Sequence, residues 1–329
     1  MSSSSPLSSD RPYLVLQEQE PDGTGSLVEC LTVFLTVSTC PVGCKMCDLH
    51  HHTLPYPTPI GAIPRQIDFA QRDAASAQWI KLYNSGNFFD TRSIPTKDYQ
   101  HVIDRLQGYR RVIIENHPKF GVGKLDDFCS QLSPQLEIAV GLETVQPGWL
   151  NRLGKQMTRD DFDRYARFIR ERGIDLRVFL ILGTPGVSIK ESFRWAMLSV
   201  RHAAKQGARH ISLIPARGSN APPSPTRPES HSQPTVQDFT VEHAGAATDS
   251  VEVFVHQTVE VSGMSSQWGG HYGSLPQFKP EDLIEFQEDA LEWASGEVVV
   301  TVDPWDLDPV NKHVQRIQTL NLTQGNRTV

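Results

Sequence analysis

The sequence predicts an α/β fold built on a parallel β-sheet. Short apolar runs rich in Val, Ile and Phe begin at Leu31 and recur along the chain as far as Ile214. Amphipathic segments long enough to form helices separate these runs. Parallel neighbours need such long crossovers, whereas antiparallel strands can be joined by a short turn. The repeat fits a barrel or an open doubly wound sheet, and periodicity alone does not choose between them.

Each element of this repeat has its own signals. We expect strands at residues 31–37, 79–83, 111–115, 136–141, 176–182 and 209–214, and helices at 64–77, 97–107, 121–131, 158–172 and 188–206. The helix that follows Thr158 is the clearest, because Thr158 and Asp161 form a T-x-x-D capping box and Gly173 can end the helix.

Composition divides the chain into four parts. These are a disordered tail at 1–25, a core at 26–217, a Pro/Ser-rich insertion or linker at 218–262, and a C-terminal extension packing on the core at 263–329. Alternating valines predict a short strand within 251–261. In the extension, a helix begins at Pro280, runs to about residue 295 and leads into a strand at 297–302.

Bulk composition is that of a soluble globular protein, with 38% hydrophobic and 21% charged residues. No apolar run approaches the roughly 18 residues that a membrane span needs, and the Ser-rich start has no apolar signal region. We therefore expect a cytoplasmic protein without membrane contact. The net charge of −7 disfavours broad binding to a phosphate backbone, although a local basic patch would still allow it.

Cysteine usage indicates metal binding rather than disulfides. The chain has five cysteines, an odd number, and Cys40, Cys44 and Cys47 lie within one short segment. A disulfide scaffold would spread an even set along a shorter chain. Cys30 and Cys129 stand apart, and we interpret both as buried small hydrophobic residues.

The segment Cys40-Pro-Val-Gly-Cys44-Lys-Met-Cys47 has the spacing C-x3-C-x2-C. Three thiolates can converge on a [4Fe–4S] cluster and leave one iron open for S-adenosylmethionine (SAM), whereas four thiolates would make a closed electron carrier. Two alternatives stay open. A zinc site could use His50 as the fourth ligand, and an electron carrier could recruit Cys30 or Cys129.

C-x3-C-x2-C directly after the first predicted strand resembles the signature of the radical SAM superfamily, over roughly residues 30–217. The resemblance implies a partial (βα)6 TIM-like barrel with the C-terminal helix–strand part as an extension. It also implies chemistry at the carboxyl ends of the strands. The expected cofactors are a [4Fe–4S] cluster on the three cysteines and SAM, with a reductant such as flavodoxin or ferredoxin as partner.

Further segments match the family at the strand ends, and the resemblance implies their roles. The expected SAM contacts are Asn84, Ser85 and Gly86 for the amino group, Glu143 for the ribose, Met46 and Ile211 for the adenine, Gly183 in a GxPG-like turn, and Arg217 for the carboxylate. For Arg217 a structural salt bridge is an equal alternative. No residue is identified as a catalytic acid or base.

Within the superfamily, these motifs resemble the elongator and methylthiotransferase branch, and most of all the radical SAM subunit of archaeosine synthase. That resemblance implies a tRNA base as substrate. A small molecule or cofactor precursor is the alternative, favoured by the net charge and by the lack of a recognisable RNA-binding module. A non-enzymatic zinc-binding protein with a Cys3His site is the alternative from a different class.

Overall fold

The computed structural model describes residues 7–47, 49–72, 74, 76–216, 275–304 and 307–324. These residues form one sheet with the strands in sequence order. The strands are β1 (Leu14–Pro21), β2 (Leu27–Leu35), β3 (Trp79–Asn84), β4 (Arg111–Glu115), β5 (Gln135–Glu143), β6 (Asp175–Leu182), β7 (Ala208–Pro215) and β8 (Val299–Val302).

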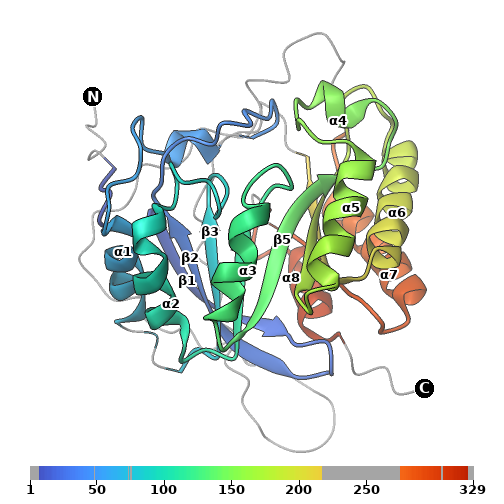
Figure 1. Cartoon of the computed structure of the whole chain (residues 1–329). Helices are drawn as coiled ribbons and strands as arrows, with labels where there is room; N and C mark the ends of the chain where they lie inside the picture. The colour runs from blue at the N-terminus through green and yellow to red at the C-terminus, as the bar shows by residue number, and fades with distance from the viewer. Residues whose placement is uncertain are drawn as a thin grey trace, which may run out of the picture.

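Strands β2 to β8 are parallel to their neighbours, and β1 is antiparallel to β2. The sheet curls into a half-barrel, which confirms the predicted partial barrel. The helices are α1 (Ala62–Gln71), α2 (Tyr99–Leu106), α3 (Val122–Ser130), α4 (Trp149–Arg152), α5 (Arg159–Arg170), α6 (Ile189–Lys205), α7 (Pro280–Ala294) and α8 (Lys312–Leu322). Helix α4 lies beyond the carboxyl ends of the strands, at the top of Figure 1.

Helix α5 shows why the sequence signals worked. The hydroxyl of Thr158 accepts a hydrogen bond from the Asp161 N–H, and the Asp161 carboxylate accepts one from the Thr158 N–H. This capping box satisfies two donors that the helix itself cannot use. Phe162 and Ile169 then lie buried on the face toward the sheet. The predicted capping box and core face are confirmed.

The predicted tail at residues 1–25 is wrong for Leu14–Pro21, which form β1. The acidic residues Glu18 and Glu20 suggested exposure, but both are directed into the half-barrel, where cations compensate them.

Helices α4 and α8 were also not predicted. The linker at 218–262, with its expected strand, lies outside the described residues. The predicted helix from Pro280 and the strand that follows it are confirmed, and β8 extends the sheet beside β7.

Two apolar layers hold the fold together. The larger lies between the sheet and the helices and includes Leu31, Ile80 and Leu82. The smaller lies on the other face of the sheet around Trp79 and Cys30, and Cys30 is only 1% exposed. Strand residues point alternately to the two faces, so each parallel strand contributes to both layers. Cys30 is thus a buried small residue, as expected, whereas Cys129 is only partly buried, so the prediction for Cys129 is wrong.

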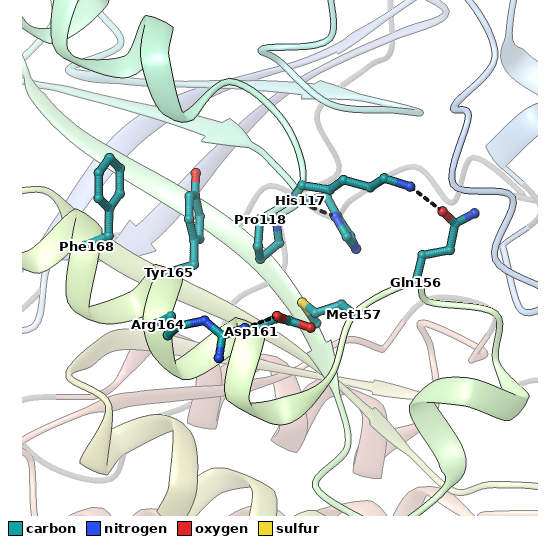
Figure 2. Close-up of a pocket in the computed structure, with 9 residues that line it drawn as sticks. His117, Pro118, Gln156, Met157, Asp161, Arg164, Tyr165 and Phe168 are labelled. Carbon is teal, nitrogen blue, oxygen red and sulfur yellow. Dashed lines mark hydrogen bonds and ion pairs between the residues drawn. The ribbon is translucent and has the colours of Figure 1, made fainter.

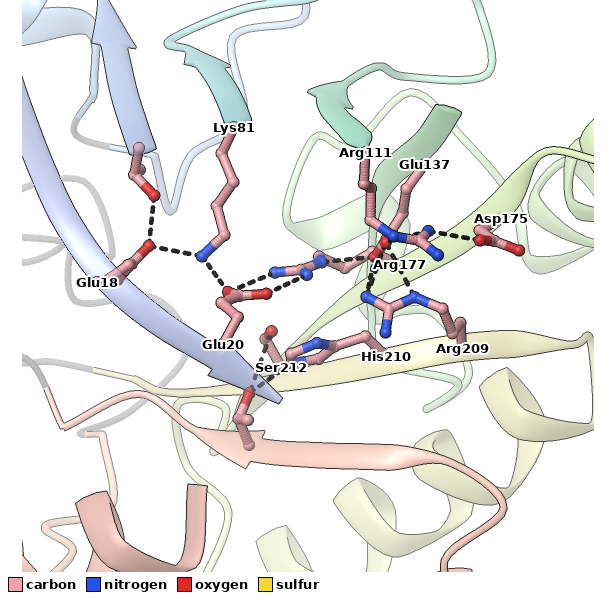
Figure 3. A network of polar contacts seen from close by, with 12 residues as sticks. Glu18, Glu20, Lys81, Arg111, Glu137, Asp175, Arg177, Arg209, His210 and Ser212 are labelled. Atoms are coloured by element: carbon pink, nitrogen blue, oxygen red, sulfur yellow. Dashed lines mark hydrogen bonds and ion pairs between the residues drawn. The ribbon is translucent and has the colours of Figure 1, made fainter. Parts of the chain in front are cut away.

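Charged side chains fill the inside of the half-barrel near the amino ends of the strands (Figure 3). Glu137 is fully buried and accepts hydrogen bonds from Arg177 Nε at 2.8 Å and Arg111 Nη1 at 2.9 Å, and from Arg209. Arg177 also binds Glu20 Oε2 at 2.6 Å, which ties β1 to β6 across the interior. This ion network closes the lower end of the half-barrel.

The network balances its own charge. The cations are Lys81, Arg111, Arg177 and Arg209, and the anions are Glu18, Glu20, Glu137 and Asp175. Burial would raise the pKa of Glu137, but the three arginines together lower it to about 2. Burial lowers the pKa of the neighbouring His210, which therefore stays neutral. A balanced set of this kind has a structural role and leaves no charge for an ionic ligand.

In the part of the chain that the structure describes, the helices are too short or too polar to cross a bilayer.

Candidate active site

The cysteine loop (residues 40–47) follows β2 and lies at the carboxyl ends of the parallel strands. The Cys47 N–H donates to the Cys44 carbonyl at 3.1 Å, which forms a tight turn between the two thiols. Asn87, which follows β3, donates to Cys40 Sγ at 3.4 Å. All three cysteines are free thiols and partly exposed. Burial raises the pKa of the Cys44 thiol, and nearby Lys155 partly offsets this effect.

In the residues described, no three His, Cys, Asp or Glu side chains are already arranged as a metal-ligand set, which holds for Cys40, Cys44 and Cys47 both with and without His50. His50 directs Nδ1 to the Cys47 carbonyl at 3.1 Å. The donor set still fits an iron–sulfur cluster, because three free thiols share one short loop. Asn84 beside it is 2% exposed, and neither its amide nitrogen nor its amide oxygen has a hydrogen-bond partner.

Unpartnered buried polar groups are costly, and they are expected where a ligand completes the hydrogen bonds. Ser85 Oγ is also buried and unpartnered. Gly86 packs close to the cysteine loop, since a Cβ there would lie 3.9 Å from Cys40 Cβ and 3.0 Å from Ser93 Oγ. The structure thus brings Asn84, Ser85 and Gly86 together with Cys40, as the sequence suggested.

Glu143 ends β5 in an unusual backbone conformation. Its φ of +65° is rare for a residue with a side chain, and a β-bulge separates it from Gly141. The bulge directs the Glu143 carboxylate to Lys155, whose Nζ lies 2.5 Å from Oε1. Strained backbone of this kind persists where the surroundings enforce it, often at functional sites. A ribose would have to use Oε2 or displace the ammonium group.

An apolar cluster lies on the other side of the cysteine loop. It consists of Met46, Trp149, Leu153, Ile181 and Ala216, with Cys44 and Leu275 packed against it. Met46 is buried, and its neighbours come from the ends of β6 and β7 and from α4. An apolar wall of this kind suits the flat face of a nucleobase.

Two of the expected SAM contacts, Ile211 and Gly183, are not brought to this group. Ile211 lies in mid-strand with its side chain in the outer core and its backbone paired with β6 and β8, so it faces the helices instead. At Gly183 a Cβ would lie 2.8 Å from both Pro276 and Phe278, so the chain itself covers this glycine. Arg217 lies outside the described residues.

Many solved structures share this architecture, and two of them are compared with this chain. SuiB from Streptococcus suis superposes with a TM-score of 0.52 and 11% identity, over 83% of this chain and 48% of SuiB. A radical SAM methyltransferase from Sphaerobacter thermophilus superposes with a TM-score of 0.50 and 16% identity, over 89% of this chain and 77% of that enzyme. The chain has the fold of radical SAM enzymes. It spans about half the length of SuiB. No protein-family model and no curated protein matches the sequence.

Three further polar residues, Glu115, His117 and Lys155, lie at the same end of the half-barrel. Glu115 ends β4 and accepts the Asn84 N–H at 3.1 Å, and burial raises its pKa to about 8. His117 binds the Lys155 carbonyl oxygen through Nε2 at 2.8 Å, and burial lowers its pKa to about 4. The run Glu115-Asn116-His117 at the end of β4 was a usable signal, because such positions line the functional end of a barrel. Lys155 lies in a loop and had no such signal.

Proposed function

We propose that the chain is a radical SAM enzyme, in which Cys40, Cys44 and Cys47 hold a [4Fe–4S] cluster that reductively cleaves SAM. One observation carries this proposal. The C-x3-C-x2-C loop lies at the carboxyl ends of the strands of a partial barrel, beside the buried and unpartnered polar groups of Asn84 and Ser85.

Different residues of the chain would bind different parts of SAM. Asn84, Ser85 and Gly86 would bind the amino-acid part of SAM, Glu143 the ribose and Met46 the adenine, and Arg217 would pair with the carboxylate. When bound, the cluster supplies one electron to the sulfonium of SAM and so starts radical chemistry. Asn87 would orient the Cys40 thiolate by its N–H···S hydrogen bond. The apolar cluster around Met46 would exclude water from the reacting end.

We expect the protein to turn brown on anaerobic reconstitution with iron and sulfide, and to release 5′-deoxyadenosine from SAM when reduced by dithionite. Flavodoxin or ferredoxin would supply the electron in the cell. Absorption spectra and chromatography of the nucleoside product check both results. A colourless protein that binds zinc stoichiometrically and leaves SAM intact would contradict the proposal.

We propose a tRNA base as the substrate, on the resemblance of the site motifs to the archaeosine synthase group. The exposed cations Lys45, Arg152 and Arg159 lie in or near the cysteine loop and α4, at the open end of the half-barrel. Filter binding of tRNA should therefore show an affinity that falls steeply with salt, since phosphate contacts release counterions. SAM cleavage without tRNA binding at any salt concentration would instead indicate a small-molecule substrate.

A further inference from the structure

The turn at residues 153–156 is fastened to the cysteine loop on both sides of Cys44. The Lys45 N–H donates to the Leu153 carbonyl at 2.8 Å, and Gln156 Nε2 donates to the Val42 carbonyl at 2.8 Å. A Cβ on Gly154 would lie only 3.8 Å from the Gly43 carbonyl oxygen. The position of this turn is therefore fixed relative to the thiols.

The outer side of the turn borders a surface cavity of about 520 Å³ between the end of β4 and α5 (Figure 2). Lys119 Nζ reaches Gln156 Oε1 there at 2.7 Å, which holds Gln156 in place from the solvent side. Lys155 does not line this cavity. Its Nζ instead lies 2.5 Å from Oε1 of Glu143, at the carboxyl end of β5.

Lys155 is a buried cation in the site, with a side chain only 12% exposed. Gly141 leaves the room that the Lys155–Glu143 pair occupies, because a Cβ there would lie 2.5 Å from Lys155 Nζ. Burial would lower the pKa of Lys155, but Glu143 raises it, followed by the thiols of Cys44 and Cys47. The ammonium is ion-paired with Glu143 at 2.5 Å, on a turn that is hydrogen-bonded to the cysteine loop.

We propose that Lys155 sets the reduction potential of the [4Fe–4S] cluster and that Glu143 partly neutralises this effect. The inference rests on the proposed function and concerns the charge environment of the same site. A cluster held by three thiolates carries negative charge and gains more when it takes up an electron. A fixed cation nearby stabilises the reduced form more than the oxidised form, especially where water is scarce.

The test is a redox titration of the reconstituted cluster without SAM, with dithionite as the reductant. Visible absorption gives the reduced fraction of the cluster at each solution potential, and the midpoint of the titration is the reduction potential. Lys155→Met should lower the reduced-to-oxidised ratio at a fixed potential by about tenfold, or roughly 59 mV for one electron. Glu143→Gln should move the potential in the opposite direction, because it leaves the ammonium unopposed. Lys155→Arg should restore the wild-type value. Lys119→Met, which also touches the turn, should leave the potential unchanged.

Opposite shifts in the Lys155 and Glu143 variants support the inference, because a merely structural role would not produce them. Unchanged potentials in a protein that loads its cluster and cleaves SAM would overturn the inference and leave the proposed function standing. If Lys155→Met fails to load the cluster, Glu143→Gln alone decides, and a shift to lower potential there would overturn the inference. Failure of the wild-type protein to form any cluster would refute both.

Discussion

Replacing Cys44 with Ala is expected to abolish both cluster assembly and SAM cleavage. Only two thiolates would remain on the loop, too few to hold a [4Fe–4S] cluster in place of the usual three or four. The fold should survive, because Cys44 is partly exposed and its side chain packs at the edge of the small apolar cluster around Met46. Iron and sulfide analysis after reconstitution, and the yield of 5′-deoxyadenosine, should both fall to background.

Cys30 and Cys129 provide the matched controls for this prediction. Burial strongly raises the pKa of the Cys30 thiol, which lies within the inner apolar layer, and also raises that of Cys129, to about 11. Cys30 lies within β2 and Cys129 within α3, both outside the cysteine loop, so Ala at either position should leave iron content and SAM cleavage at wild-type levels. Loss of the cluster in either variant, with the circular dichroism spectrum unchanged, would instead identify a fourth protein ligand and a closed electron carrier.

The parallel strands could be predicted because both of their faces are buried. A strand such as Arg111–Glu115 is a short apolar run, and the helices around it show one apolar face each. Strand β1 was missed because it carries acidic residues that are usually exposed. Its Glu18 and Glu20 are compensated by Lys81 and by Arg177, far away in the sequence. Local pattern cannot reveal an ion pair between such distant residues.

Only those residues of the candidate site that lie at the ends of parallel strands could be predicted from the sequence. Cys40, Asn84 and Glu143 each follow or end a parallel strand, and such residues meet at one edge of the sheet. Ile211 differs from these residues, because it lies within its strand and its side chain packs in the core between the sheet and the helices. Lys155 could not be found, because its place depends on how its loop docks onto the cysteine loop.

Arg177→Met is expected to destabilise the fold by about 3–5 kcal/mol, since it leaves buried carboxylates without their main partner. Arg177 is 2% exposed and pairs with Glu137 at 2.8 Å and Glu20 at 2.6 Å. Urea unfolding at pH 7 measures the change. The exposed pair of Arg172 and Asp126 is the control, and Arg172→Met should alter the free energy of unfolding far less than Arg177→Met does, because water screens an exposed pair. Equal effects of the two variants would contradict a structural role for the network.

The destabilisation caused by Arg177→Met should depend on pH, and the pKa values of the buried carboxyls determine the direction of this dependence. Burial would raise the pKa of Glu20, but Arg177 and Lys81 hold it well below its usual value. The pKa of Glu137 is lowered in the same way by the arginines around it. A carboxylate with a lowered folded pKa contributes stability above its unfolded pKa of about 4.3, and that contribution is lost as the pH falls toward the folded value. In the Arg177→Met protein these carboxyls can instead take up protons in the folded state. The stability difference between wild type and variant should therefore be largest at pH 7 and shrink toward pH 3. A difference that stayed constant over this range would show that lost packing around the Arg177 side chain, rather than unpaired charge, destabilises the variant.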